Sequence, residues 1–301
     1  MRTPPIAMLL FAVLPASAQS HDPAPYKISV DVNLVVLNAT VRDRKGRMVS
    51  DLQERDFEIY EEGVRQSIRL FRHEDIPVSV GLVIDHSTSM REKLPEVIAA
   101  ARTFVQTSNP EDRMFVVNFN EKVTLGLRAG AGWSNRAEDL EQAISGTPAE
   151  GMTALYDAVA VALDRLRAGD GKKVLIVISD GGDNASRHTL AEALKMAEAS
   201  AAMVYTIGIF GEHDEDRNPD VLRRLARVTG GETYVPRELK EVVAICERIA
   251  RDIRHQYTLG YVPSAAATPG VYRAIRVAAG GTADGKLLVR ARSGYIAGGQ
   301  K

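Results

Sequence analysis

The chain has 301 residues, of which 45% are hydrophobic and 26% charged, a composition typical of a globular protein with one or two domains. Its 38 Lys and Arg residues nearly balance its 39 Asp and Glu residues, which gives a formal net charge of −1. Proteins that bind nucleic acid or an anionic membrane surface through charge need an excess of basic residues. The composition therefore indicates neither class, and we expect no nucleic-acid partner.

Residues 1–18 have the pattern of an export signal. Arg2 supplies positive charge, residues 6–14 are apolar, and residues 16–18 match the A-x-A sequence of a signal cleavage site. The apolar stretch is too short to span a bilayer comfortably, and an uncleaved anchor is the alternative. We predict cleavage after Ala18, a periplasmic or secreted mature chain, and no stable membrane insertion after cleavage.

The segment 26–75 has the residue pattern of β-structure. A run of strand length occurs at 35–42, and the runs at 57–60 and 66–71 flank an acidic turn that contains Gly, as in a hairpin. A sheet of this size is too small to be stable alone. We therefore expect this segment to find a partner elsewhere in the chain.

The segment 256–296 supplies three further runs of strand length, at 256–262, 270–278 and 286–291. We predict that it packs with 26–75 in a smaller β-sandwich-like module, because neither set of strands can close a core by itself. The region 77–255 is then an insertion whose ends lie close together. Two separate small flanking sheets are the alternative.

Strands and helices alternate between residues 77 and 255. Apolar runs of strand length occur at 78–84, 114–119, 122–127, 173–179, 203–209 and 233–235, and amphipathic patterns of helical spacing separate most of them. The third run follows the second too closely for a crossover, so we expect these two runs to pair antiparallel. The alternation predicts an α/β fold with a doubly wound, mostly parallel six-stranded sheet.

The first of these runs, 78–84, ends in the sequence D-x-S-x-S, with Asp85, Ser87 and Ser89 at alternate positions. These side chains place oxygen atoms at the carboxyl end of a central strand, the edge at which open α/β sheets bind ligands. Oxygen donors without His or Cys suit Mg²⁺, Mn²⁺ or Ca²⁺, and not Zn²⁺ or Cu²⁺. A Ser- and Thr-rich turn that caps the next helix is the alternative.

Two later segments add oxygen donors. Thr153 lies in a small loop before a helical pattern, and Asp180 directly follows a buried-strand run. A D-x-S-x-S motif, a loop Thr and a strand-end Asp, in this order, resemble the von Willebrand factor A (VWA) domain, whose metal-ion-dependent adhesion site is built from these three segments. The resemblance covers 77–255 and implies the Rossmann-like VWA fold. Thr88 departs from the family, which often has Gly at this position, but the position is not a ligand.

The resemblance carries metal-binding roles to Asp85, Ser87, Ser89, Thr153 and Asp180. It implies that these residues hold a divalent cation, with Mg²⁺ as the expected ion and Mn²⁺ or Ca²⁺ as alternatives. The flanking segments also resemble an exported bacterial subfamily of VWA-related proteins, and that resemblance covers nearly the whole mature chain.

Three further polar residues lie near the expected site. His86 lies within the D-x-S-x-S motif, and we expect it to point away from the ion, with a rim contact to a partner as the alternative. Asp183 and Asn184 follow Asp180 and either support the metal ligands or cap the following helix, and we favour the cap.

Asp214, Asp216 and Asn218 have the first spacings of a calcium-binding loop. Pro219 occupies the position of the Gly that such loops need, and Leu225 occupies the position of the bidentate Glu. We therefore interpret this segment as a solvated acidic loop at the rim of the same sheet edge.

The VWA resemblance implies a binding module that recruits a protein partner through its cation. Neutral Ser and Thr hydroxyls leave positive charge on the ion, which then accepts an acidic side chain of the partner as its last ligand. A structural envelope protein with a stabilising metal, or a metal-assisted hydrolase, are the alternatives. The chain has no G-x-S-x-G, H-E-x-x-H, C-x-x-C or Walker A motif, so we expect no enzymatic activity, no catalytic residues and no further cofactor.

Overall fold

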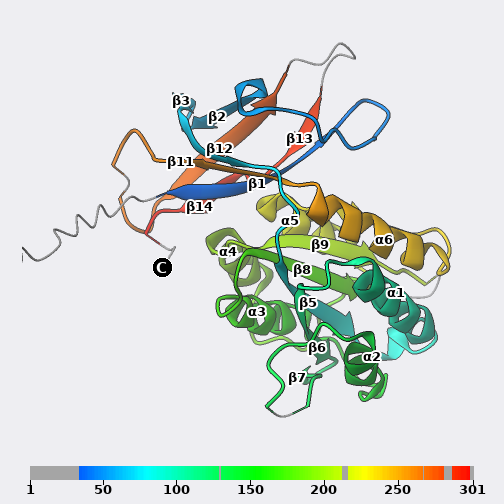
Figure 1. Cartoon of the computed structure of the whole chain (residues 1–301). Coiled ribbons are helices and arrows are strands. Elements are labelled where there is room, and N and C mark those ends of the chain that lie inside the picture. Colours follow the sequence, from blue (N-terminus) through cyan, green and yellow to red (C-terminus); the bar gives the residue numbers. More distant parts are fainter. Residues whose placement is uncertain (1–33, 129, 212–215, 267, 281–286, 299–301) are drawn as a thin grey trace, which may run out of the picture. The chain divides into compact units, whose positions relative to one another are not determined.

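The computed structural model describes residues 34–298 except 129, 212–215, 267 and 281–286 (Figure 1). The predicted signal at 1–18 therefore lies outside the described residues. The described chain contains a six-stranded sheet and two four-stranded sheets. The predicted doubly wound, mostly parallel α/β fold with additional β-structure is confirmed.

The six-stranded sheet has the strand order β10-β9-β8-β5-β6-β7. Its strands are β5 (Val78–Asp85), β6 (Arg113–Phe119), β7 (Val123–Leu125), β8 (Lys172–Ser179), β9 (Met203–Gly208) and β10 (Thr233–Tyr234). All neighbouring strands are parallel except β7, which is antiparallel to β6 as its short link requires. All eight residues of β5 are buried, because helices cover both faces of the sheet.

Six α-helices of the described chain flank this sheet: α1 (Leu94–Thr107), α2 (Ala137–Ser145), α3 (Leu155–Leu166), α4 (Leu190–Ala199), α5 (Pro219–Thr229) and α6 (Glu241–Arg254). Apolar side chains of α1, α2 and α6 form one core with the sheet, and those of α3, α4 and α5 form the other. The amphipathic helices thus bury the two opposite faces of one sheet (Figure 1).

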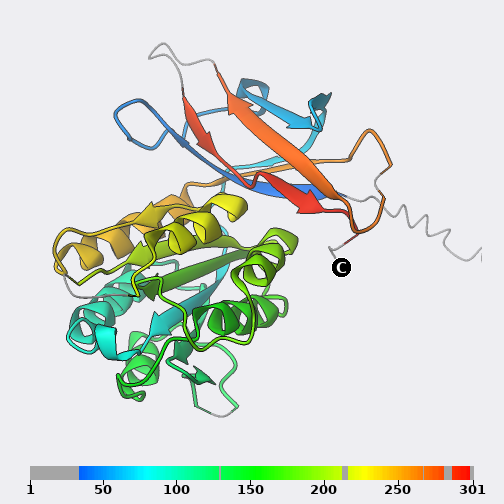
Figure 2. The same ribbon diagram turned by 180° about the vertical axis from the view of Figure 1, so that it is seen from behind.

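The two four-stranded sheets combine strands from both ends of the chain. One sheet has the order β13-β1-β11-β4, with β1 (Val35–Arg42), β4 (Ile68–Arg72), β11 (Tyr257–Tyr261) and β13 (Leu288–Arg290). The other has the order β14-β12-β2-β3, with β2 (Phe57–Glu61), β3 (Val64–Gln66), β12 (Tyr272–Ala279) and β14 (Gly294–Ile296). Figure 2 shows the orange and red C-terminal strands side by side with the blue and cyan N-terminal strands. Leu37, Ile59, Leu259 and Ile275, from strands of both sheets, lie in one apolar core.

The predicted hairpin at 57–71 differs from the structure in its second half. The turn at Glu62 and Gly63 is present, but only β3 pairs with β2, whereas β4 pairs with β11 in the other sheet. The Gln66 side chain fixes this change of sheet, because its amide oxygen accepts from the Ser264 backbone N–H at 3.0 Å and its amide nitrogen donates to the Ser264 hydroxyl at 3.1 Å. Apolar–polar alternation predicts a strand and does not identify its partner.

No helix in the described ranges is both long and apolar enough to cross a membrane.

Candidate functional site

The carboxyl ends of β5 and β8 bring two of the predicted metal ligands to the same edge of the sheet. The two strands are parallel neighbours with Ile84 opposite Ile178, so the next residue along each strand, Asp85 or Ser179, reaches the same level. Asp180 follows directly after β8. Both apolar runs end here in oxygen-bearing side chains, at the edge where doubly wound sheets bind ligands.

Asp85 is a fully buried carboxylate, 0% exposed. Its Oδ1 accepts a hydrogen bond from the Ser87 backbone N–H at 2.8 Å, and its Oδ2 accepts one from the Ser179 hydroxyl at 2.6 Å. Burial raises the pKa of Asp85 to about 6, hydrogen bonds from Ser179 and Ser87 oppose this rise, and the negative charge of Asp180 adds to it. None of these effects on the Asp85 pKa comes from a positively charged side chain of the described residues.

Ser87, Ser89 and Asp180 form a continuous chain of oxygen atoms. The Ser89 hydroxyl donates to Asp180 Oδ2 at 2.6 Å, and the two serine hydroxyls lie 3.1 Å apart. Asp180 Oδ1 accepts from the Gly182 backbone N–H at 3.0 Å, which fixes the rotamer of the carboxylate. A 3-10 turn at Thr88–Met90 bends the chain and lets the alternate serines meet. Three of the five predicted ligands are thus joined through their side chains, and Asp85 is joined to them through the Ser87 backbone N–H.

Thr153 is held nearby by backbone contacts. The Thr88 hydroxyl and backbone N–H both donate to the Gly151 carbonyl, at 3.1 and 3.3 Å, and so join the D-x-S-x-S loop to the Thr153 loop. The Thr153 backbone N–H donates to the Asn184 side chain at 2.9 Å, and its carbonyl accepts from the Asn184 N–H at 3.0 Å. Among the described residues, no direct hydrogen bond links the Thr153 side chain to the other four predicted ligands.

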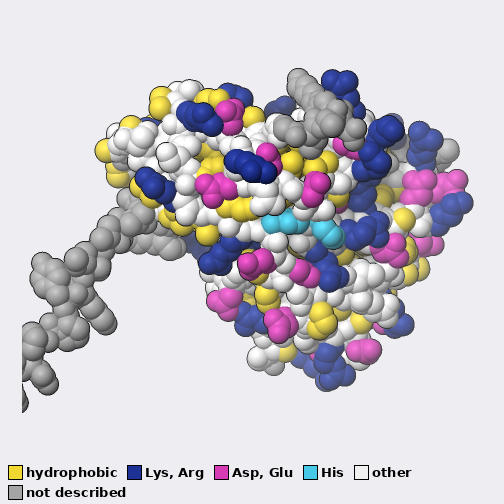
Figure 3. Space-filling view, turned by 45° about the horizontal axis from the view of Figure 1, so that its top comes forward, with side chains coloured by type: hydrophobic (Ala, Val, Ile, Leu, Met, Phe, Trp, Pro, Cys, Tyr) yellow, Lys and Arg dark blue, Asp and Glu magenta, His cyan; other side chains and the backbone are white. Residues whose placement is uncertain are grey.

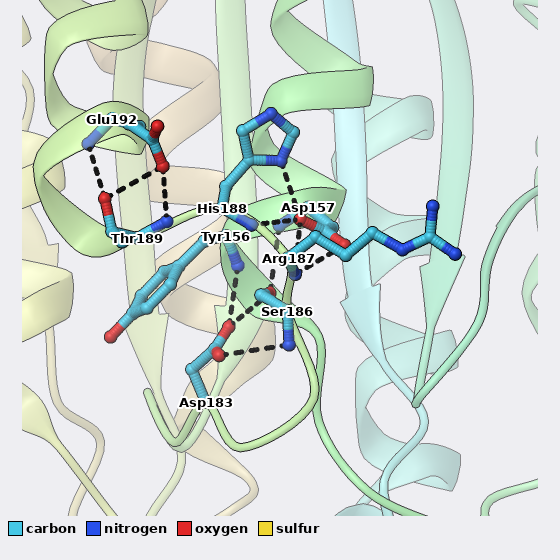
Figure 4. Close-up of polar contacts among 8 residues, drawn as sticks. All are labelled: Tyr156, Asp157, Asp183, Ser186, Arg187, His188, Thr189 and Glu192. Atoms are coloured by element: carbon cyan, nitrogen blue, oxygen red, sulfur yellow. Dashed lines mark hydrogen bonds and ion pairs between the residues drawn. The ribbon is translucent and has the colours of Figure 1, made fainter.

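The segment that follows Asp180 supports the Thr153 loop, which corrects the cap predicted for Asp183 and Asn184. Asp183 Oδ2 accepts from the Tyr156 backbone N–H at 2.9 Å, in the first turn of α3 (Figure 4). The helix that actually follows, α4, is capped instead by the reciprocal Thr189–Glu192 box. The favoured cap is wrong, because the N–H that Asp183 accepts from lies on a different helix and the N–H that Asn184 accepts from lies in the Thr153 loop. These non-local partners have no sequence signal.

Asp157 is a supporting residue that the sequence did not single out. It accepts from the backbone N–H of Arg187 at 3.1 Å and of His188 at 2.9 Å, and it lies 2.7 Å from His188 Nδ1 (Figure 4). Partial burial opposes ionisation, but the hydrogen bonds from His188 and Arg187 outweigh it and lower the pKa of Asp157. An acidic residue in the first turn of a helix is common for electrostatic reasons alone, so its second role was hidden.

His86 is 0% exposed. Its backbone is hydrogen-bonded to two other segments of the chain. The His86 N–H donates to the Phe119 carbonyl at 2.6 Å, and the His86 carbonyl accepts from the Glu150 N–H at 2.9 Å. Burial lowers the pKa of the ring, which favours a neutral histidine. The alternative of a rim contact between His86 and a partner is wrong, since the residue has no exposed surface.

The residues at 214–218, which have the spacing of a calcium-binding loop, do not form a second cation site as far as the structure describes them. Asp214 lies outside the described residues. Asp216 accepts from the Asn184 side-chain amide at 2.9 Å, and the Asn218 side chain caps α5 at Val221 N–H. The Asn218 backbone N–H donates to the Asp180 carbonyl at 3.0 Å, so the loop does reach the same sheet edge.

The oxygen donors at this edge fit a hard divalent cation. They comprise two carboxylates and three neutral hydroxyls, a set suited to Mg²⁺, Mn²⁺ or Ca²⁺. The described residues hold no cluster of three or more His, Cys, Asp or Glu side chains that could bind a metal ion. Because Asp180 disfavours the ionised form of Asp85, a bound cation would relieve a repulsion that is present in the protein alone.

Comparisons with known proteins agree with this fold. The family model for the von Willebrand factor type A domain matches residues 79–245. The solved structure of a von Willebrand factor type A protein from Catenulispora acidiphila is 14% identical, with a TM-score of 0.53, and the match covers 89% of this chain and 75% of that one. The vWF domain of the type V pili tip protein Mfa5 from Porphyromonas gingivalis is 15% identical, with a TM-score of 0.50, and the match covers 60% of this chain and 95% of that one.

At these identities the structural likeness concerns the fold alone, and a search of curated proteins finds no match to this chain. The family model, however, covers more than half of the chain, and the described helices and strands of that region have the expected doubly wound arrangement. The chain therefore belongs to the von Willebrand factor type A domain family.

Proposed function

We propose that this protein is an exported binding module that holds a divalent cation at the edge formed by β5 and β8 and recruits a protein partner there. The observation that carries the proposal is the pair Asp85 and Asp180. The first carboxylate is buried, the charge of the second raises its pKa, and within the described ranges neither carboxylate forms a salt bridge. A charged pair of this kind needs compensation, and a divalent ion from solvent supplies it.

The ion would be held by Asp85, Ser87, Ser89, Thr153 and Asp180, with Mg²⁺ as the expected occupant and Mn²⁺ or Ca²⁺ as alternatives. When bound, it supplies positive charge that can attract an acidic side chain. Three of the five groups are neutral hydroxyls, so the protein neutralises the ion less than a carboxylate cage would. The hydrogen bonds among Ser87, Ser89 and Asp180 keep these donors together before the ion arrives.

The surface beside the site is compatible with a protein partner. Met152 precedes Thr153 and is 53% exposed, although a Met side chain usually gains from burial. A flexible apolar side chain beside a charged centre is typical of surfaces that bind other proteins. VWA domains mediate protein–protein interactions, and one structure of similar fold is a domain of a pilus tip protein, which is compatible with adhesion.

Export and the domain boundaries belong to the same proposal. The export pattern supports removal of residues 1–18, and N-terminal sequencing of the native protein tests it. A mature chain that begins at Gln19 is expected, whereas a membrane-bound chain that begins at Met1 would contradict export. The shared sheets support a module of 26–75 with 256–296, into which the VWA domain of 77–255 is inserted.

A capture experiment tests the binding function. The mature protein is immobilised and exposed to an envelope extract, with Mg²⁺ in one arm and a chelator in the other. We expect a specific partner to be retained only with Mg²⁺ and to be lost in Asp85→Ala, while the exposed-site control Asp164→Ala behaves as the wild type. Capture that is equal in both arms would exclude the metal from partner binding. Stabilisation by Mg²⁺ without any captured partner would favour the structural alternative.

A further inference from the structure

A second charged region lies away from the metal edge, where β1 and β13 meet α6. Two cavities of about 380 and 370 Å³ adjoin here and share Arg42, Gly46 and Arg248 in their walls. Arg44 and Arg290 line the first cavity, and Arg251 and His255 line the second. Each cavity falls within the range of roughly 300 to 1,000 Å³ that is typical of ligand pockets. Figure 3 shows Lys and Arg side chains gathered on one side of a face that also carries His.

The acidic residues of this cleft are already paired. Asp252 is bonded to Arg42 and accepts from the Tyr234 hydroxyl at 3.1 Å. Glu232 lies 2.6 Å from Arg290. Asp43 is paired at 2.7 Å with Arg47, which does not line either cavity. The carboxylates in the walls are therefore paired mainly with Arg42, Arg47 and Arg290, and Asp252 acts on Arg248 only from a distance.

Three arginines of the cleft lack a close anionic partner. Within the described ranges, Arg44 and Arg248 form no salt bridge, and Arg251 has only a 3.9 Å contact to Glu247 on its own helix. The Arg248 guanidinium lies 5.4 Å from the centre of the Tyr234 ring, and its Nε is buried without a hydrogen-bond partner. The Arg42 Nε is also buried without a partner. Unpaired buried donors are rare in proteins, and a bound water or anion is one explanation for them.

We propose that this cleft binds an organic ligand that carries two oxyanion groups, phosphate or carboxylate, held by Arg248 together with Arg44 and Arg251. Guanidinium groups are planar and charged, and they bind both kinds of oxyanion through paired hydrogen bonds. Two adjoining cavities, one lined by Arg44 and the other by the weakly paired Arg251, meet at the shared Arg248 and favour two anionic groups over one. Met48 and Leu287 add apolar wall to the two cavities, which suits a carbon skeleton between the charges.

Calorimetric titration of the mature chain tests the proposal with two probes at constant ionic strength and without metal. Inorganic pyrophosphate represents the phosphate source, and citrate represents the carboxylate source. We expect saturable binding of at least one probe at one equivalent, and the stronger probe identifies the preferred anion. Binding of neither probe above the level of added chloride would overturn the proposal.

Matched variants locate the binding. Arg248→Gln should weaken it at least tenfold and Arg44→Gln severalfold, whereas Arg136→Gln, an exposed arginine of the VWA domain, should change nothing. Because Arg248 lies on Tyr234, melting curves first establish that its variant is folded; if it is not, the exposed Arg44 variant decides the outcome. Equal losses of probe affinity in Arg44→Gln and Arg136→Gln would show that binding depends on the overall positive charge, and this would contradict a specific site. Asp85→Ala should retain full anion binding, which separates this proposal from the metal-dependent function.

Discussion

Two regions of the molecule bury carboxylates, but only one of them places a positively charged side chain beside the buried group. Where the flanking strands meet α6, Asp252 is 2% exposed, and burial raises its pKa, but Arg42 and Arg248 act against that rise. At the edge formed by β5 and β8, burial raises the pKa of Asp85 to about 6, and the neighbouring charge of Asp180 raises it further. The first region contains its own counter-charge, whereas the second lacks one among the described residues.

This difference indicates what each region is for. A buried ion pair completed within the chain holds two segments in one arrangement, and its removal affects folding. A buried carboxylate without a cation is costly unless a positive ligand is recruited. We therefore expect the stability of the first region, called here the junction, to depend on Arg42. The stability of the edge formed by β5 and β8 should depend on the concentration of a divalent ion.

The largest effect is expected at the junction. Arg42→Met leaves Asp252 buried, with the Tyr234 hydroxyl as a hydrogen-bond donor and Arg248 acting only from a distance. We expect the free energy of unfolding to fall by about 3 kcal/mol, the lower end for a broken buried pair. Urea denaturation measures it. The double variant Arg42→Met/Asp252→Leu should recover most of the loss, and an equal loss in single and double variants would rule out uncompensated charge as the cause.

A smaller effect is expected from the residue that holds Thr153. Asn184→Ala removes the acceptor of the Thr153 backbone N–H and also the donor to Asp216. Residues that orient metal ligands typically change metal affinity by about 10- to 100-fold, and we expect Mg²⁺ affinity to fall about tenfold. A Mg²⁺ titration of thermal stability measures this change, with Asn135→Ala as the control. An unchanged midpoint would mean that Thr153 does not contribute to the ion.

The smallest effect has the opposite sign to the junction variant. In a chelator, Asp180→Asn removes one of two repelling charges, and the amide oxygen can still accept from the Gly182 N–H. We expect the metal-free variant to be as stable as the wild type or up to about 1 kcal/mol more stable, the scale of one pKa unit. Thermal unfolding at neutral pH measures the difference. A clear loss of stability would show that Asp180 stabilises the fold in the absence of an ion.

Local signals in the sequence predicted the sheet edge well. An apolar run that ends abruptly in D-x-S-x-S identifies both the strand and its polar end, and Asp180 follows the same rule on the neighbouring strand. The doubly wound fold follows from strand–helix alternation for the same reason. These features depend on residues close together in the chain, so periodicity and the point where it stops are sufficient to find them.

Features that depend on distant residues could not be predicted in the same way. The pair Arg42 and Asp252 spans 210 positions, and neither residue differs in type from any surface charge. Asp183 was assigned to the wrong helix because its donor, the Tyr156 N–H, lies 27 positions earlier. The change of sheet at Ser67 interrupts no spacing in the sequence, because Val64, Ile68 and Leu70 stay an even number of positions apart. Propensity and pattern describe an element, while its partner is decided by tertiary packing.

Calorimetry with and without Mg²⁺ tests the central claim most directly, using the wild type, Asp85→Ala, Asp180→Ala and the exposed control Asp164→Ala. At about 100 times its dissociation constant, an ion that binds only the folded state stabilises it by about 2.7 kcal/mol. We predict this shift in the wild type and the control, a smaller shift in Asp180→Ala, and none in Asp85→Ala. A full shift retained in Asp85→Ala would place the ion elsewhere and contradict the account.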